Sequence, residues 1–294
     1  MKKYIKYLAI AAFAVFAASC HEKPLDYCNS QIIDSAVEQN DFDKWLDENF
    51  VEPYNIDFKY RMEYNESDMN YYLVPAEYEK SIQIAKLLLH LCINSYDEVT
   101  GSKDFIRGNF PKMVHLVGSA AYKNNGTMVL GTAEGGLKMT LYYINSLQLD
   151  PEFLNYYYFK TMHHEFAHIL HQTKPYPSDF EMISGTDYVA DTWSDVWQGG
   201  DAEAQQNGFI SEYASKEANE DFVEIIATYI TNDATTWNNI LKKAGDGGSV
   251  IQSKFDIVYN YMMNSWGIDL NELRSVILRR ESEIPTLDLT DITL

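Results

Sequence analysis

The feature that most constrains this chain is the stretch HHEFAHILHQ at residues 163–172. Asp150 followed by Pro151 is typical of a helix start, and Pro175 lies just beyond the stretch, so the sequence predicts one helix through Gln172. Phenylalanine, methionine, isoleucine and leucine surround the histidines. The fold must therefore bury this helix and still accommodate four histidines on it.

Residues 164–168 form an HExxH motif. At about 100° per residue, His164 and His168 differ by about 40° around the helix, so both rings can reach one ion from adjacent turns. Glu165 points about 100° away from His164, which suits a carboxylate that contacts a metal-bound water and takes its proton. The motif predicts a zinc site with two histidine ligands and a base.

The remaining histidines receive other interpretations. His171 lies on the same stripe of the helix but about 4.5 Å of rise beyond His168, too far to share an ion with His164. His163 points about 100° away, and we expect it to be exposed or to support a ligand. His90 and His115 are expected to be structural.

A third ligand is predicted in SEYASKEANEDFVEIIATYI, where a helix is expected at about 216–231. Glu220 and Glu224 lie four residues apart, opposite the main apolar face, and the small Ala227 would allow close approach of the histidine helix. We predict that Glu220 binds the metal and that Glu224 accepts the second ring N–H of a metal-bound histidine. A solvent-facing pair of carboxylates is the alternative.

Other acids could supply the third ligand instead. Asp187 or Asp191 in GTDYVAD is the first alternative, because the stretch is similar to the GTxD element of zincins with an aspartate ligand. The tyrosine-glycine continuation of that element is absent. Asp179 and Glu181 are further candidates.

The chain begins with lysines followed by an apolar run and small residues, in MKKYIKYLAIAAFAVFAASC. This pattern is typical of a secretory signal peptide over 1–19, and it is too short to span a bilayer. Cys20 directly after the small residues is similar to a bacterial lipobox and is a candidate lipidation site. An ordinary cleaved signal is the alternative. We expect a tether over 20–30 and a single domain over 31–294.

Charge excludes some partners. Three of the 23 basic residues lie in the signal, so the mature chain would carry 20 basic against 43 acidic groups, a net charge near −23. Such a polyanion is not expected to bind nucleic acid or anionic lipid, so membrane contact would be through the lipid anchor alone. Cys28 and Cys92 could form a disulfide, but Cys92 in LLLHLCI is equally consistent with a buried free thiol.

Periodicity predicts an α+β fold of zincin type, with a small, mostly antiparallel sheet, an active-site helix and a helix-rich C-terminal half. The N-terminal α/β lobe would cover about 31–172 and the C-terminal helical lobe about 173–294. The expected elements, in order, are a helix through Trp45 and Phe50 that stops at Pro53, a strand over 56–60, a helix that starts at Pro75, strands over 110–144 with a turn at Asn125-Gly126, the histidine helix, an acidic loop over 173–210, and helices at 216–231, 234–244, 249–265 and 269–281.

The motifs resemble those of gluzincin metallopeptidases, in which a glutamate on a later helix completes the zinc site. YASKEANEDFVE is similar to the anthrax lethal-factor type, and this resemblance implies that Tyr213 assists the transition state. With the lipobox, WLDENFVEPYNIDFKYR, HHEFAHILHQ and NEDFVE, the chain resembles the zinc-binding metallopeptidase lipoproteins of Bacteroidetes, also called substrate import-associated zinc metallohydrolase lipoproteins. That family implies attachment to the Gram-negative outer membrane, on its periplasmic or outer face, near nutrient-import complexes.

The predicted activity is that of a zinc peptidase acting on peptides or proteins, with Glu165 activating the metal-bound water and Tyr213 stabilising the oxyanion. A substrate peptide could pair as an extra strand along GGLKMTLYYI. An accessory binding lipoprotein with a structural or vestigial zinc is one alternative, since the chain has 22 tyrosines and five tryptophans. A zinc amidase or deacetylase is another.

Overall fold

The structure is a computed structural model that describes residues 38–124 and 126–293. Residues Asn40–Leu294 form one compact unit. The expected signal peptide, most of the segment before Asn40, and the cysteines at positions 20 and 28 lie outside the described residues. Within the described part, no helix has the length and apolar character needed to cross a membrane.

The first described elements form a continuous helical stretch that leads into a short strand. Asn40 caps the stretch with a capping box, because its side chain accepts from the N–H of Asp43 and its own N–H donates to the Asp43 carboxylate. Pro53 lies inside the last turn, so the helix ends slightly later than predicted, at Asn55 in the left-handed conformation. The elements are α2 (Asp41–Leu46), η2 (Asp47–Val51), α3 (Glu52–Tyr54), β1 (Asp57–Lys59) and η3 (Tyr64–Glu66), where η marks a π-helix or a 3-10 helix.

A long helical crossover follows and carries the chain to the second strand. It starts at Tyr78 with Glu77 at the N-cap, three residues after the predicted start at Pro75. Cys92 is buried on it. The segments are α4 (Tyr78–Leu87), η4 (Leu88–Ile93), α5 (Asn94–Thr100) and α6 (Asp104–Asn109).

The main sheet has the strand order β1-β2-β6-β5. The pairs β1–β2 and β2–β6 are parallel, and only β5–β6 is antiparallel. The prediction of a mostly antiparallel sheet is therefore wrong for this sheet, because the helical crossover returns the chain to pair in parallel with β1. Its further strands are β2 (Met113–Leu116), β5 (Gly131–Glu134) and β6 (Lys138–Leu141).

The turn predicted at Asn125-Gly126 falls in the connection between two further antiparallel strands of two residues each, β3 (Ala121–Tyr122) and β4 (Met128–Val129), and Asn125 lies outside the described residues. The hairpin of the main sheet instead turns at Gly135 and Gly136, both of which have positive φ angles. β5 is thus one end of the sheet order, and β6 is an inner strand.

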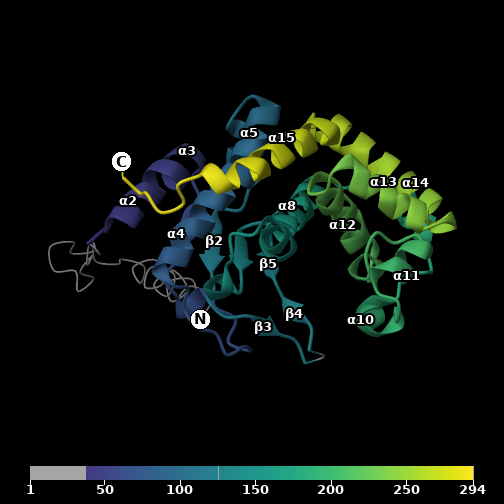
Figure 1. Cartoon of the computed structure of the whole chain (residues 1–294), viewed down its shortest axis with the longest axis horizontal. Coiled ribbons are helices and arrows are strands. Elements are labelled where there is room, and N and C mark those ends of the chain that lie inside the picture. The colour runs from purple at the N-terminus through teal and green to yellow at the C-terminus, as the bar shows by residue number, and fades with distance from the viewer. Residues whose placement is uncertain (1–37, 125, 294) are drawn as a thin grey trace, which may run out of the picture. The chain divides into compact units, whose positions relative to one another are not determined.

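The histidine helix is one continuous stretch, as the sequence predicts. The Asp150 carboxylate accepts from the N–H of Phe153 and caps it, and Pro151 occupies the first turn. It contains the segments α7 (Pro151–Leu154), η6 (Asn155–Phe159) and α8 (Lys160–Thr173). In Figure 1, α8 lies at the centre of the fold, between β5 and α12 (Ala218–Ile230).

The C-terminal part is helical, and α12 is its centre. Every residue from Glu220 to Ile230 is buried, so α12 has no solvent-facing side, unlike the one-sided helix predicted from its pattern. It packs on α8 and on later helices, and α15 (Leu270–Glu283) crosses from α12 to α5 (Figure 1). The predicted loop over 173–210 holds three short α-helices and one short 3-10 helix. The other elements are η5 (Ile144–Ser146), α9 (Asp179–Ser184), η7 (Ala190–Thr192), α10 (Trp193–Val196), α11 (Asp201–Gln206), η8 (Tyr213–Ser215), α13 (Ala234–Lys243), α14 (Asp246–Tyr261), η9 (Met262–Trp266) and η10 (Ile284–Thr286).

Candidate metal centre

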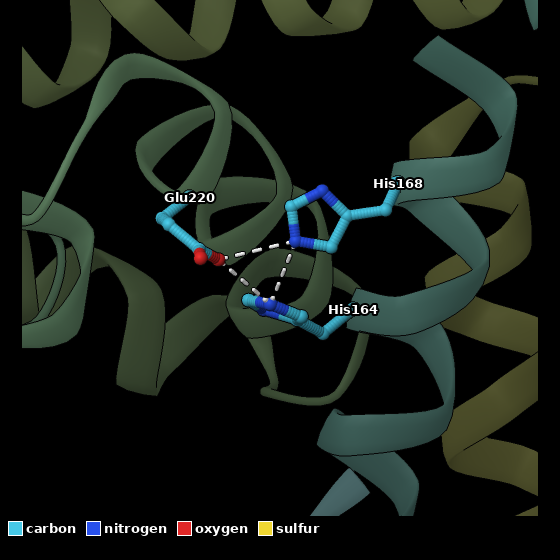
Figure 2. A group of neighbouring side chains, drawn as sticks. All are labelled: His164, His168 and Glu220. Carbon is cyan, nitrogen blue, oxygen red and sulfur yellow. Dashed lines mark hydrogen bonds and ion pairs between the residues drawn. The ribbon is translucent and has the colours of Figure 1, made fainter. Parts of the chain in front are cut away.

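Helices α8 and α12 bring three potential ligands together. The Nε2 atoms of His164 and His168 lie 3.2 Å apart, and Oε2 of Glu220 lies 3.2 Å from the first and 3.1 Å from the second. Figure 2 shows the two rings and the carboxylate pointing toward one another across the gap between the helices. Within the described part of the chain, these residues form the one group of three or more with ligand atoms close enough to share a metal ion.

The donor set fits zinc. Two imidazole nitrogens and one carboxylate oxygen, all within 4.8 Å of one another, are the protein ligands of many catalytic zinc sites, which keep a fourth position for water or substrate. Calcium and magnesium prefer sites made of oxygen alone. The chemistry of these ligands therefore favours a transition metal such as zinc.

Glu220 uses its two oxygens differently. Its Oε1 accepts hydrogen bonds from the Tyr213 hydroxyl at 2.7 Å and from Nζ of Lys216 at 2.8 Å, and Oε2 faces the histidines. Burial opposes ionisation, but hydrogen bonds from the two histidines and from Lys216 hold the pKa of Glu220 far below its usual range. The ionised carboxylate thus has one oxygen left for a cation.

Glu224 lies behind His164. Its Oε1 accepts from Nδ1 of His164 at 2.9 Å, and its Oε2 accepts from Nζ of Lys160 at 2.7 Å and from Oγ of Ser211 at 2.5 Å. Burial disfavours an imidazolium, but hydrogen bonds to Glu220 and Glu224 raise the pKa of His164 to about 10. In the metal-free protein this ring therefore holds a proton, and a metal ion would have to displace it.

Glu165 belongs to α8, and its side chain points toward the end strand β5. Burial raises its pKa, and the nearby His164 and His168 partly offset this effect. The backbone N–H of Ala133 in β5 hydrogen-bonds to its carboxylate. A Cβ atom at Gly131 would lie 2.5 Å from Thr161 Cγ2, so glycine is what lets β5 approach α8 this closely.

The other histidines differ from one another in their surroundings. His171 is outside the ligand group, but its Nε2 lies 3.0 Å from Nδ1 of His168. His163 is neither exposed nor next to a ligand atom, which corrects the prediction. It is buried with Nδ1 3.3 Å from the Tyr96 hydroxyl, and burial lowers its pKa to about 3. His115 is buried on β2.

The alternative acids do not reach the site. Asp179, Glu181, Asp187 and Asp191 are all exposed, and none belongs to the ligand group. They lie in the segment of short helices between α8 and α12. The geometry favours Glu220 over all four.

Sequence reasoning missed several polar partners of the site. Lys160 precedes His164 by four residues, and Lys216 precedes Glu220 by four, so helical spacing could have revealed both. Ser211 gave no such signal, because it reaches Glu224 from a loop before η8. Trp193 was also missed; its ring packs against Tyr213 with centroids 4.9 Å apart.

The fold and the site together define a class of protein. An α+β protein that presents two histidines one turn apart, with a glutamate between them in sequence and a third ligand on a later helix, has the arrangement of a zinc-dependent hydrolase.

Comparison with known proteins agrees with this class. Residues 35–271 match the model of a family described as "Putative zinc-binding metallo-peptidase", and the chain belongs to that family. A crystal structure with the same description, from Bacteroides caccae, is 47% identical in sequence, with a TM-score of 0.74. The match covers 86% of this chain and 96% of that one. No curated protein matches the chain.

Proposed function

We propose that this protein is a zinc peptidase in which His164, His168 and Glu220 hold the metal. The observation that carries the proposal is the meeting of the three ligand atoms within 4.8 Å, with the partly buried Glu165 beside them and hydrogen-bonded to Ala133 of strand β5. A purely structural zinc site has no use for such a base. When bound, zinc would lower the pKa of a coordinated water and polarise the substrate carbonyl.

Glu165 is the general base of the proposed mechanism. It takes a proton from the attacking water and passes it to the leaving nitrogen as the amide bond breaks. Burial raises its pKa, which suits a group that must both accept and release a proton.

Tyr213 is proposed to donate a hydrogen bond to the carbonyl oxygen as negative charge develops on it. Its hydroxyl is held at Glu220 Oε1, so it must leave that oxygen, which Lys216 continues to bind. In a Tyr213→Phe variant, kcat should fall about tenfold or more while KM changes little, because a hydrogen bond to a charged group contributes about 1.5–3 kcal/mol. Unchanged kcat would remove Tyr213 from the mechanism.

A substrate peptide is proposed to pair with the end strand β5. The stretch GGLKMTLYYI, where the sequence predicted the peptide to pair, contains β6, which is an inner strand with a neighbour on each side. β5 ends the sheet, lies against α8 and reaches Glu165 through Ala133. Strand addition there would bring a peptide bond beside the ligand group.

The proposal extends to the location of the protein. Lipidation of Cys20 would attach it to the outer membrane, near a nutrient-import complex that takes up the products. Labelling of the protein by a radioactive fatty acid, and its loss in Cys20→Ala, would test the anchor.

The first test is metal content per chain in purified protein. We expect about one zinc in the wild type, clear loss in Glu220→Ala, and retention in Glu217→Ala, which removes an exposed acid three residues away. A peptide-library screen of the zinc-loaded protein then tests the activity. Zinc without peptide cleavage would instead favour an amidase or a binding lipoprotein, and wild type without zinc would refute the metal site.

A further inference from the structure

The two histidines of the ligand group have different groups behind them. Nδ1 of His164 donates to a carboxylate, Glu224, at 2.9 Å. Nδ1 of His168 faces another imidazole, Nε2 of His171, at 3.0 Å. Ligand histidines in proteins are usually oriented by a carboxylate, a backbone carbonyl or water, so His168 has an uncommon partner.

A metal ion bound at Nε2 would fix which nitrogen of the His168 ring carries the proton. Nε2 of His168 points to Glu220 and His164, so a cation held between them would take the lone pair of this nitrogen. The proton of the neutral ring is then on Nδ1, and it is donated to Nε2 of His171. His171 can accept it only as a neutral ring with its own proton on Nδ1.

The surroundings of His171 hold its ring in place. The side chain is buried, and its ring lies 5.5 Å from the Tyr176 ring and 6.3 Å from the Phe222 ring, measured between centroids. Those two rings stack at 4.2 Å, and the Tyr176 hydroxyl donates to the Asn219 side chain, next to Glu220. The rings of Tyr176 and Phe222 thus hold His171 in place relative to both helices. Their apolar surface disfavours an imidazolium.

We propose that His171 is a positioning residue for the metal centre: it accepts the Nδ1 proton of His168 and so keeps Nε2 of His168 free and aimed at the metal. This inference rests on the zinc site proposed above. It also makes the two ligand histidines unequal, because a carboxylate increases the basicity of His164 more than a neutral imidazole increases that of His168.

The test compares zinc affinity in three variants, measured by competition with a chromogenic chelator. His171→Leu keeps bulk but has no acceptor, and it should weaken zinc binding about 10- to 100-fold. His171→Gln places an amide oxygen near the position of Nε2 and should restore most of the affinity. His90→Leu alters a histidine on η4, outside the ligand group, and serves as the control.

A second readout separates orientation from general loss of packing. In the cobalt-substituted protein, the visible absorption spectrum should change in His171→Leu and return toward wild type in His171→Gln. Wild-type zinc affinity and cobalt spectrum in His171→Leu would overturn the role of His171 and leave the zinc site intact. Absence of zinc binding by the wild type would overturn both proposals.

A third measurement needs no variant, in case His171→Leu does not fold. Long-range ¹H–¹⁵N correlation spectra of the zinc-loaded wild type report the tautomer of each histidine ring. We expect protons on Nδ1 of both His168 and His171. A proton on Nε2 of His171 would refute the proposal.

Discussion

Two neighbouring acids on helix α12 show how differently the two sides of this helix use buried charge. Glu220 faces α8, and Lys216, Tyr213 and the two ligand histidines surround it. Asp221, the next residue, faces α14 and pairs with Lys254 at 2.6 Å. The side chains of Asp221 and Lys254 are both fully buried.

The difference lies in the number of donors around each carboxylate. Burial raises the pKa of Asp221 to about 6, although Lys254 and the Tyr188 hydroxyl bind it. The pKa of Glu220 is lowered well below its usual range despite burial. One side of α12 therefore carries a closed ion pair that joins two helices, and the other carries negative charge arranged to hold a cation.

The largest effect is expected for Glu165, the proposed general base beside the ligand group. Glu165→Gln removes the proton acceptor and keeps the shape, so kcat/KM on a peptide found in the screen should fall about 10²- to 10⁴-fold. Zinc content should stay at the wild-type level, since Glu165 is outside the ligand group. Turnover that persists in this variant would refute the mechanism.

The buried pair of Asp221 and Lys254 should matter for folding and not for metal binding. Lys254→Met leaves Asp221 buried without its cation, so the free energy of unfolding should fall by about 3–5 kcal/mol, measured by urea denaturation. Lys123→Met, at an exposed lysine, is the control. Zinc per folded chain should be unchanged, and a specific loss of zinc in Lys254→Met would contradict the separation of the two sides.

Glu224, which accepts a hydrogen bond from Nδ1 of His164, should matter for metal binding and not for folding. Glu224→Gln should weaken zinc binding about 10- to 100-fold, as is typical for residues that orient a metal ligand. Asp221→Asn, three residues earlier, changes an acid that pairs with Lys254 and with no histidine, so it should leave zinc affinity unchanged. Chelator competition on both variants would measure this contrast directly, and equal losses would erase it.

Zinc affinity should also depend on pH. The pKa of His164 in the metal-free protein is about 10, above its unfolded value of 6.5, so its contribution to stability is complete below about pH 6.5 and is lost as pH rises through 10. Zinc must displace that proton. Apparent affinity should therefore rise about tenfold per pH unit between about pH 7 and 9. A flat profile would show that His164 is already neutral.

The sequence by itself determined the local parts of the site. The capping Asp150 and Pro151 fixed the start of the histidine helix, and the HExxH spacing placed His164 and His168 on one side of it. The four-residue spacing of Glu220 and Glu224 on a predicted helix named the two acids that the structure brings to these histidines. These features depend on one helix at a time, so periodicity reveals them.

The strand order and the contacts between distant elements became known only from the tertiary structure. The parallel pairing of β1, β2 and β6 leaves β5 as the end strand, and this strand order depends on where a crossover of more than 50 residues returns the chain. Ser211 meets Glu224, and Phe222 fixes His171, through contacts between distant elements. His163, one residue from a ligand, lies in the core. Local propensity carries no information about such contacts, because packing between elements sets which side of each helix is buried.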